Sequence, residues 1–364
     1  MTTTAYQSPE SARPGRSASG PVFRALAARW LVLLLVALTL VACDTPPPRS
    51  HNYSGATMGT YWTVQLVAGD RGRIDGMQQA IEEALETVNS QMSTYRADAH
   101  ISQFNRAEAG EAIHVPAEFA EVLEAAMQIA QESDGLFDPT IGPLVNLWGF
   151  GPDGSRREPP SEQEIIQALA RVGWQRLQWD AQQRRLTQPG GAYLDFSAIA
   201  KGYAVDLIAQ ALEQRHIESY LINIGGDMRA SGNRPDGTPW RIGIERPHSA
   251  SPEVHSVIQI GNAAVVTSGS YRNFFEADGE HFSHTIDPRT GQPVPNDLVS
   301  VTVVHDDCTL ADAYATAITV MGLEKGLEYA NSKDLAVFLL VKEGEALREH
   351  MTSAFEPLLQ NRSQ

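Results

Sequence analysis

Residues 254–267 read VHSVIQIGNAAVVT, two runs rich in β-branched residues that a Gly-Asn pair separates. Runs of this composition, bounded by turn residues, are typical of β-strands. Two further strands are predicted near 281–286 and 299–305, and the links between neighbouring strands in this part of the chain are short. Short links favour antiparallel pairing, because a parallel pair needs a long crossover. This stretch therefore predicts an antiparallel sheet.

Helical patterns surround these strands. Apolar residues recur every three or four positions from Met77 to Met92 and from Phe119 to Ile129, the spacing that places them on one face of a helix. Helices are predicted over 77–92, 119–129, 161–173 (opened by a Ser161/Glu164 capping box), 198–214 and from Thr309, with further strands near 61–67, 176–179, 184–187, 192–196, 219–224, 240–245 and 335–342. The mixture predicts the α+β class, a single compact domain over residues 55–360 with an antiparallel sheet and flanking helices.

The composition excludes several classes of protein. The chain has 364 residues, a formal charge of −16 and 42 % hydrophobic residues, which excludes a disordered chain and a multi-span membrane protein. The negative charge argues against nucleic-acid binding, which relies on basic residues against phosphates. Two cysteines, Cys43 and Cys308, are too few for a disulfide scaffold or a thiolate zinc cluster.

The first 42 residues resemble a bacterial lipoprotein signal peptide. Four arginines precede the apolar run Trp30–Ala42, which is too short for a bilayer-spanning helix of roughly 20 residues. The run ends in LVAC at 40–43, which resembles a lipobox, where the chain is cut before the cysteine and the sulfur is acylated. We therefore predict a signal peptide over 1–42 and a lipid anchor on Cys43. The alternative is a short membrane anchor in which the cysteine is incidental.

A short tether is predicted between that anchor and the domain, so that 43–54 comprise the lipidated cysteine and a linker. Residues 44–54 read DTPPPRSHNYS, a proline-rich polar composition typical of linkers. Asp44, directly after the cysteine, resembles the inner-membrane retention signal of lipoproteins in enteric-type bacteria. The predicted location is therefore the inner membrane, lipid-anchored and facing the periplasm. Loss of the signal peptide removes four arginines and one glutamate, which makes the mature charge −19.

Asp312 and Thr316 form a candidate metal site. They are four residues apart on a predicted helix, so both side chains share one face. A carboxylate and a hydroxyl are hard oxygen ligands that suit Mg²⁺. The competing interpretation is structural, because Thr309 and Asp312 also have the spacing of a capping box, in which Asp312 would bind only backbone N–H groups.

Two strand ends carry polar residues of a kind that can hold a ligand. Residues 194–203 read LDFSAIAKGY, in which Asp195 and Lys201 flank a turn and a helix start. Helix N-termini attract phosphate, although a surface salt bridge has the same pattern. Residues 220–227 read YLINIGGD, a strand running into a Gly-Gly turn that lets backbone approach a ligand. This is not a G-x-G-x-x-G motif, and most Gly-Gly pairs are only turns.

His284 is the candidate general base, because histidine changes protonation near neutral pH. Its serine and aspartate neighbours also suggest a hydrolase triad, but the chain contains no G-x-S-x-G elbow. Met58, Tyr95 and Phe137 could line a flat aromatic ligand, although each alone is more often a core residue.

Eight segments carry a resemblance to a known family. They are, in chain order, TMGTYW (57–62), MSTYR (92–96), GLFDPTIGPLVNLWGFG (135–151), LDFSAIAKGYAVD (194–206), YLINIGGD (220–227), TSGSYRNFFE (267–276), HTIDPRTG (284–291) and ADAYAT (311–316). In this order they closely resemble the FAD:protein FMN transferase family, the ApbE-type flavin transferase lipoproteins. They span residues 57–316, and the lipobox fits the same family.

The resemblance implies a Mg²⁺-dependent enzyme that moves the FMN half of FAD onto a Thr or Ser hydroxyl of another protein. A phosphoester bond remains and AMP leaves. By the family pattern, the metal ligands would be the backbone carbonyl of Ala198 and the side chains of Asp312 and Thr316. The FAD-contacting positions would be Met58, Tyr95, Leu136, Phe137, Asp138, Asp195, Lys201 and Ile286. Some members have an aspartate where this chain has Ala315, so a second tightly bound metal is not expected.

The resemblance also implies partners. Family precedent points to membrane redox subunits of the sodium-translocating NADH:quinone reductase and Rnf-type complexes as flavin acceptors. The role of His284 as the base that deprotonates the acceptor hydroxyl is our hypothesis from residue type and neighbourhood. Two alternatives stay open, namely an FAD pyrophosphatase that gives FMN and AMP, and a non-catalytic periplasmic lipoprotein that binds flavin.

Overall fold

The computed structural model describes residues 49–360, apart from 155, 157, 248–252, 270–272, 296 and 345. The predicted signal peptide 1–42, the predicted anchor Cys43 and the first part of the tether lie outside the described residues. No helix within the described ranges has the length and apolar character needed to cross a bilayer.

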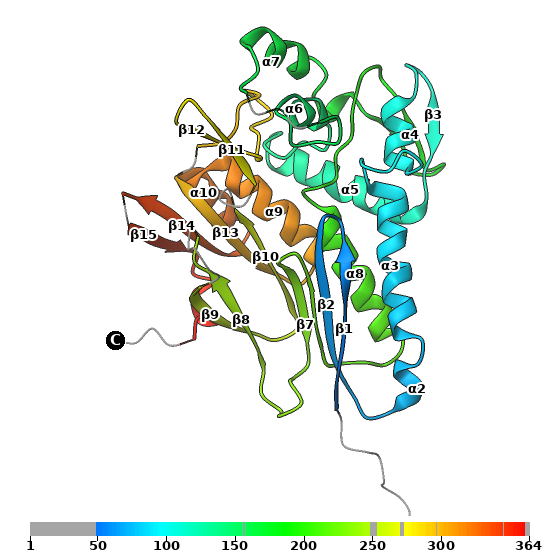
Figure 1. Cartoon of the computed structure of the whole chain (residues 1–364), viewed down its shortest axis with the longest axis vertical. Coiled ribbons are helices and arrows are strands. Elements are labelled where there is room, and N and C mark those ends of the chain that lie inside the picture. Colours follow the sequence, from blue (N-terminus) through cyan, green and yellow to red (C-terminus); the bar gives the residue numbers. More distant parts are fainter. Residues whose placement is uncertain are drawn as a thin grey trace, which may run out of the picture. The chain divides into compact units, whose positions relative to one another are not determined.

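An antiparallel sheet of eight strands forms the centre of the domain (Figure 1). Across the sheet the order is β1 (Arg49–Thr57), β2 (Thr60–Ala68), β6 (Tyr220–Ile224), β7 (Asp227–Ser231), β10 (Ala263–Gly269), β13 (Leu298–His305), β14 (Ala336–Glu343) and β15 (Ala346–Met351). Every neighbouring pair in it is antiparallel. Nearly all residues of β13 are buried, because both faces of the sheet are covered at its middle.

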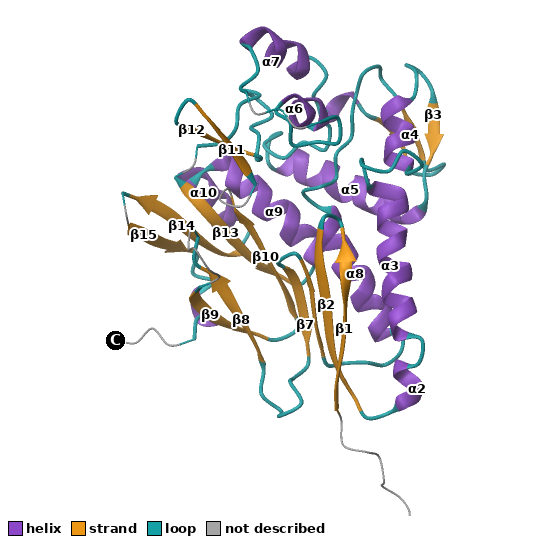
Figure 2. Cartoon of the chain, in the orientation of Figure 1, coloured by secondary structure: helices purple, strands orange, loops and turns teal. Residues whose placement is uncertain are grey.

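Helices cover one face and a two-stranded sheet covers part of the other (Figure 2). The helices are α2 (Arg71–Ile74), α3 (Met77–Met92), α4 (His100–Arg106), α5 (Ala117–Glu132), α6 (Gly142–Leu147), α7 (Glu162–Leu169), α8 (Ala200–Glu213), α9 (Cys308–Met321) and α10 (Leu323–Ser332). Apolar residues of α3, α5, α8 and α9 share the larger core cluster with inward residues of the sheet. The opposite face packs against β8 (Trp240–Glu245) and β9 (Val254–Ile260).

The remaining strands form small accessory sheets. Strands β3 (Ala112–His114), β5 (Arg185–Thr187) and β4 (Gln178–Asp180) make one of them, and β11 (Phe274–Ala277) pairs with β12 (Glu280–Ser283) in a hairpin. The α6 and α7 region packs against this hairpin around Leu144, Trp148 and Ile286. His284, the candidate general base, follows this hairpin directly.

The predicted fold class is confirmed, since helices and antiparallel sheets form one domain. The helical spacing of residues 77–92 corresponds to α3 over the same bounds. The predicted capping box opens α7, where the Ser161 hydroxyl accepts from the Glu164 N–H and the Glu164 carboxylate accepts from the Ser161 N–H.

The expected pairing of consecutive strands is wrong for the two strands of 254–267. Strand β9 pairs with β8, whereas β10 pairs with β7 and β13. The link between β9 and β10 carries the chain from the covering sheet into the main sheet. Inward residues of the first strand, such as Ile258 and Ile260, are therefore buried between the two sheets.

Two further expectations need correction. Residues 49–54, predicted as tether, belong to β1 and pair with β2 from Arg49–Ala68 to Thr57–Thr60. Their alternating polar pattern is that of an exposed edge strand. Residues 192–196 form no strand, because the side chain of Asn105 binds the backbone of Leu194 through hydrogen bonds of 2.7 and 2.9 Å. That segment is therefore held by an amide side chain rather than by a neighbouring strand.

Candidate functional site

The site begins where α8 and α9 cross. Gly202, in the first turn of α8, lies so close to α9 that a Cβ atom there would stand 2.2 Å from the carbonyl oxygen of Cys308. Only glycine permits this approach of two backbones. The crossing brings Asp312, in the second turn of α9, to the first turn of α8, where its Oδ2 accepts from the Gly202 N–H at 3.2 Å.

A lysine and two aspartates meet at this crossing, and we call Lys201, Asp227 and Asp312 the Lys201 cluster. The Lys201 Nζ lies 2.7 Å from Asp227 Oδ2 and 3.4 Å from Asp312 Oδ2. Only 4 % and 6 % of the two carboxylate side chains is exposed. Asp227 opens β7 directly after Gly225 and Gly226, whose φ angles of 60° and 108° need glycine. The hairpin turn thus delivers Asp227 to the cluster.

The Lys201 cluster holds more negative than positive charge when both carboxylates are ionised. Burial and the neighbouring Asp312 raise the pKa of Asp227 to about 7, although Lys201 acts in the opposite direction. Burial disfavours the charged form of Lys201, but Asp227 and Asp312 raise its pKa above the usual value and keep it a cation. Unpaired negative charge at a buried site stabilises a bound cation.

The oxygen donors around the cluster fit Mg²⁺. Thr316 follows Asp312 by one turn of α9 and is half-buried, and Ala198 lies half-buried just before α8. In the ranges that the structure describes, no three His, Cys, Asp or Glu side chains gather in a way that could hold a metal. A cation here would therefore also need hydroxyl, carbonyl, water or phosphate oxygens, which are the ligands of Mg²⁺.

The structural alternatives for Asp312 and Lys201 are wrong. Asp307, not Thr309, caps α9, since its side chain accepts from the Leu310 N–H at 2.8 Å. Asp312 reaches across to α8 instead of capping its own helix. Lys201 forms no surface pair with Asp195, which accepts from the Ser197 N–H at 2.8 Å.

A second charged group lies on the same elements, and we call Asp206, Arg229 and Thr309 the Asp206 cluster. The Arg229 Nη1 lies 2.5 Å from Asp206 Oδ1. The Asp206 Oδ2 accepts from the Thr309 N–H at 2.9 Å and from its hydroxyl at 2.7 Å. The sequence patterns considered above did not select Asp206, Arg229 or Asp227. Asp206 ends the segment LDFSAIAKGYAVD, four residues after Gly202, and Asp227 ends YLINIGGD, directly after the Gly-Gly turn, which are the signals that could have selected them.

His284 lies at the end of the β11–β12 hairpin. Its Nδ1 and its backbone N–H both donate to the carbonyl oxygen of Asn273, each at 3.1 Å. Because a carbonyl can only accept, Nδ1 carries the proton and Nε2 is left as a basic atom. Burial, together with the charge of Lys201, lowers the pKa of His284 below its usual value. The side chain is thus neutral at pH 7, and its partner is not the carboxylate of a hydrolase triad.

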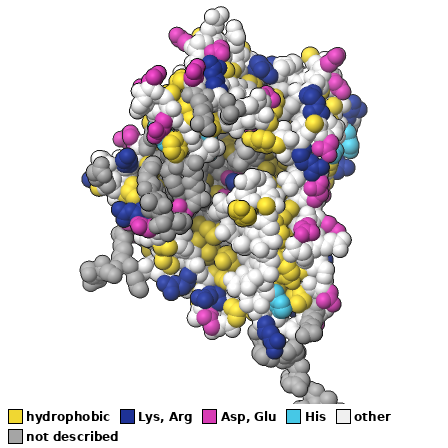
Figure 3. All heavy atoms as spheres, in the orientation of Figure 1, with side chains coloured by type: hydrophobic (Ala, Val, Ile, Leu, Met, Phe, Trp, Pro, Cys, Tyr) yellow, Lys and Arg dark blue, Asp and Glu magenta, His cyan; other side chains and the backbone are white. Residues whose placement is uncertain are grey.

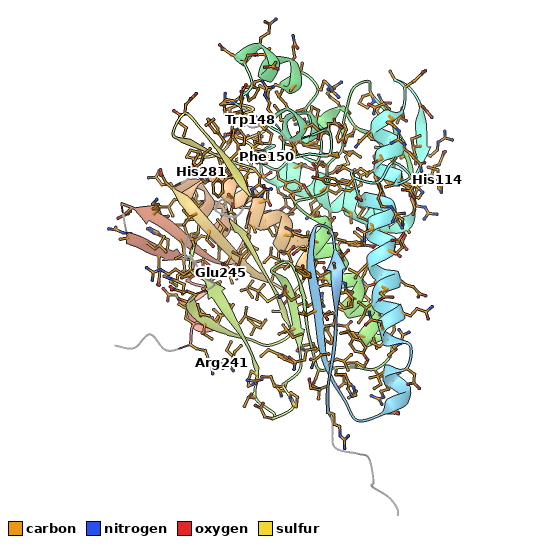
Figure 4. All side chains as sticks on the ribbon, viewed as in Figure 1. His114, Trp148, Phe150, Arg241, Glu245 and His281 are labelled. Atoms are coloured by element: carbon orange, nitrogen blue, oxygen red, sulfur yellow. The ribbon has the colours of Figure 1, made fainter. Side chains whose placement is uncertain are left out.

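An aromatic wall stands beside His284. The rings of Trp148 and Phe282 stack at 5.5 Å, and Phe150 meets His284 edge-on at 6.3 Å. Trp148 and Phe150 lie close together beside the β11–β12 hairpin that carries His281 (Figure 4). Tyr95 joins this wall through its hydroxyl, which donates to the Phe150 carbonyl at 3.3 Å while 72 % of the residue stays exposed. An exposed ring that adjoins other aromatic rings suits a flat aromatic ligand.

The loop that contains Leu136, Phe137 and Asp138 is buried and internally bonded. Phe137 lies in the main core and Leu136 packs against Val294. Asp138 accepts from the N–H and hydroxyl of Thr140 at 2.8 and 2.6 Å and from the Trp174 N–H at 3.1 Å. Burial raises its pKa despite these bonds. The Asp138 side chain therefore holds its own loop.

Further contacts connect the candidate residues. The backbone N–H of Asp195 donates to Pro139 at 2.9 Å, which ties it to the loop of Asp138. Ile286 is buried beside Trp148.

Met58 occupies the β1–β2 turn with a φ of 48°. That turn adjoins the β6–β7 turn, since the Gly225 N–H donates to the Tyr61 carbonyl at 3.0 Å. Figure 3 shows this face hollowed near its centre, where basic and acidic side chains appear between hydrophobic ones.

Comparison with known proteins identifies the family. The sequence profile of the ApbE family matches residues 58–339. The chain belongs to the ApbE family. A relative from Vibrio cholerae named FAD:protein FMN transferase is 40 % identical over 332 residues, which cover 91 % of this chain and 98 % of that protein. An Escherichia coli relative with the same name is 35 % identical over 339 residues, covering 90 % and 97 %.

Solved structures of the ApbE family have the same fold. "Flavin Transferase ApbE from Vibrio cholerae" superposes with a TM-score of 0.79 at 38 % identity and covers 86 % of this chain and 100 % of that one. The apo form of the Pseudomonas stutzeri flavinyl transferase ApbE gives 0.79 at 39 % identity, covering 87 % and 98 %. Membership makes this chain an enzyme of the flavin transferase class.

Proposed function

We propose that this ApbE-family chain transfers FMN from FAD to a Thr or Ser hydroxyl of a target protein, in a reaction that depends on Mg²⁺ and releases AMP. The observation that carries the proposal is the Lys201 cluster, a half-buried lysine between two buried carboxylates at a helix crossing. A group with excess negative charge and hard oxygens is suited to a divalent cation. An acidic protein needs such a cation to bind an anionic pyrophosphate.

In this proposal the aromatic wall and the Lys201 cluster bind different parts of FAD. Tyr95 and the wall beside it offer an aromatic surface for the isoalloxazine ring. Lys201 offers a positive charge for the pyrophosphate. A bound Mg²⁺, held by Asp312, Thr316 and the carbonyl of Ala198, would neutralise phosphate charge and stabilise the charge on the AMP leaving group. Met58, Leu136, Phe137, Asp138, Asp195 and Ile286 complete the proposed FAD contacts, Asp138 through its loop backbone.

His284 is the proposed general base. Its Nε2 takes the proton of the acceptor hydroxyl as the hydroxyl oxygen attacks the phosphorus on the FMN side of the pyrophosphate. The new P–O bond joins FMN to the protein, and the P–O bond to AMP breaks, with the bridging oxygen leaving on AMP. The lowered pKa keeps His284 neutral at pH 7, so the base form is the resting form.

The proposed setting is the periplasmic face of the inner membrane, with the chain anchored through a lipid on Cys43. The proposed acceptors are membrane redox subunits of the sodium-translocating NADH:quinone reductase or Rnf type. The described domain begins with β1 at Arg49, so five residues separate it from Cys43 in the sequence. So short a link would keep the site close to membrane-bound acceptors.

One experiment separates this proposal from its alternatives. The domain is incubated with FAD, Mg²⁺ and a candidate acceptor subunit, and the products are resolved on a denaturing gel under ultraviolet light. A fluorescent acceptor band together with AMP supports transfer. AMP with free FMN alone supports an FAD pyrophosphatase, and neither product supports a flavin-binding protein without catalysis.

A further inference from the structure

The Asp206 cluster ties together the elements that carry the Lys201 cluster. Asp206 follows Gly202 by four residues, so both occupy the face of α8 that meets α9. Besides Thr309, the Asp206 carboxylate accepts from the Cys308 N–H at 3.3 Å. The first two N–H groups of α9 are thus satisfied by a side chain of the neighbouring helix. Helix N-termini that are held in this way are fixed in position.

Strand β7 forms an ion pair with α8 at two positions, and the signs of the charges are reversed between them. Asp227 and Arg229 are two residues apart on β7 and share one of its faces. The first pairs with Lys201 of α8 and the second with Asp206 of α8. Two ion pairs of reversed polarity therefore connect α8 to β7. The pair between Asp206 and Arg229 also holds the start of α9.

We propose that Asp206, held by Arg229, is a positioning residue. It fixes the start of α9 and thereby the position of the Asp312 carboxylate. Asp312 follows Cys308 by four residues, one helical turn, so any shift at the start of α9 moves its carboxylate away from Lys201. Where it concerns metal affinity, this inference rests on the proposed function.

Hydrogen exchange at the Gly202 N–H shows whether the Asp312 carboxylate is in position, and the measurement needs no metal. This group lies in the first turn of α8, where N–H groups lack an intrahelical acceptor, and it donates to Asp312 Oδ2. Its hydrogen exchange is therefore slow only while Asp312 stays in place. Exchange at Gly202 and the affinity for Mg²⁺ give two independent readouts.

The test compares Asp206→Asn, which keeps the shape and removes the charge, with wild type. We expect exchange at Gly202 in the metal-free domain to become about tenfold faster, the effect of losing one hydrogen bond to a charged group. We also expect about tenfold weaker Mg²⁺ binding by calorimetry, the usual cost of removing an outer support of a metal ligand. The matched control is Glu213→Gln, because Glu213 lies 4.0 Å from Arg229 and accepts from the Tyr220 hydroxyl. The control should leave both readouts unchanged.

Unchanged exchange at Gly202 in a folded Asp206→Asn protein would overturn the inference, even if its melting temperature falls. If that variant does not fold, Thr309→Val removes only the hydroxyl donor to Asp206 and is measured in its place, with a smaller shift expected in the same direction. A wild-type domain that binds no Mg²⁺ would refute the metal site of the proposed function, while exchange at Gly202 would still decide the role of Asp206.

Discussion

The Lys201 cluster and the Asp206 cluster lie on the same three elements, α8, β7 and α9, yet their charges balance differently. In the Asp206 cluster one guanidinium pairs with one buried carboxylate, while the exposed Glu213 lies 4.0 Å from Arg229. Both oxygens of Asp206 also accept from the start of α9. In the Lys201 cluster one ammonium faces two buried carboxylates. The buried carboxylate of the first cluster has a full set of partners, whereas the second cluster has a negative charge left over when both of its carboxylates are ionised. Of the two, the Lys201 cluster is therefore the one whose charge suits a bound cation.

The same contrast distinguishes stability from function. Buried charges that are fully paired hold a structure, and removing one partner costs stability because it leaves the other unpaired. A buried surplus charge instead destabilises the empty site and is retained for what it binds. The following variants test this division, from the largest expected effect to the smallest.

Replacing Asp312 should have the largest effect on catalysis. Asp312→Ala removes a carboxylate of the cluster and the proposed metal ligand, so turnover should fall by about 10³-fold, the scale of several kcal/mol of metal stabilisation. FAD binding, followed by flavin fluorescence, should weaken far less because the aromatic wall is intact. Unchanged turnover at saturating Mg²⁺ would place the metal elsewhere.

Replacing His284 tests its role as the general base. His284→Gln should lower turnover by about 10²-fold. In wild type the rate should fall as the pH drops through the pKa of His284, which burial holds below its usual value, because only the neutral ring accepts a proton. The variant should lose this acidic limb. Full turnover of the variant at every pH would exclude His284 as the base.

Gly202 lies between the two clusters, and a side chain there should disturb both. Gly202→Ala places a Cβ 2.2 Å from the Cys308 carbonyl oxygen, so α8 and α9 must separate. We expect a loss of about 2 kcal/mol in the free energy of unfolding, the usual cost of overpacking, together with weaker Mg²⁺ binding. Gly261→Ala is the matched control, since no atom lies within 4 Å of the added Cβ and the backbone there is not left-handed, so the change adds neither a clash nor strain. A Gly202→Ala protein with wild-type stability would contradict the close crossing.

Asp227→Asn should have the smallest effect on stability, and with the opposite sign. The variant removes one of two carboxylates, while Lys201 keeps Asp312 as its partner at 3.4 Å. We expect the metal-free domain to become more stable by about 1 kcal/mol in chemical denaturation. Asp206→Asn, measured alongside, should instead be destabilised. If both aspartate variants lose stability equally, the two clusters do not differ in the way described.

The local structure could be predicted from the sequence, but the contacts of the site could not. Spacing alone predicts α3 and the capping box of α7, because both depend on residues close in the chain. Strands β1 and β7 are polar and have no regular spacing of apolar residues. Their conformation therefore depends on pairing with neighbouring strands.

Single residues of the candidate site could be predicted from the sequence, but the contacts between them could not. Asp312 and Lys201 could each be selected from helix spacing or family resemblance, but they are 111 residues apart in the chain. Their meeting depends on the helix crossing at Gly202, a tertiary contact. Asp206 and Asp227 each end a segment that resembles the family, but nothing near them in the sequence predicts the partner that folding brings to them.

The most direct test of the central claim is the dependence of FMN transfer on a divalent cation at the Lys201 cluster. The domain is stripped with a chelator, and AMP release and acceptor fluorescence are followed with FAD as Mg²⁺ is added back. We expect no product without metal, full recovery with Mg²⁺ for wild type and no recovery for Asp312→Ala. Transfer at the full rate by the stripped wild-type domain would contradict the account.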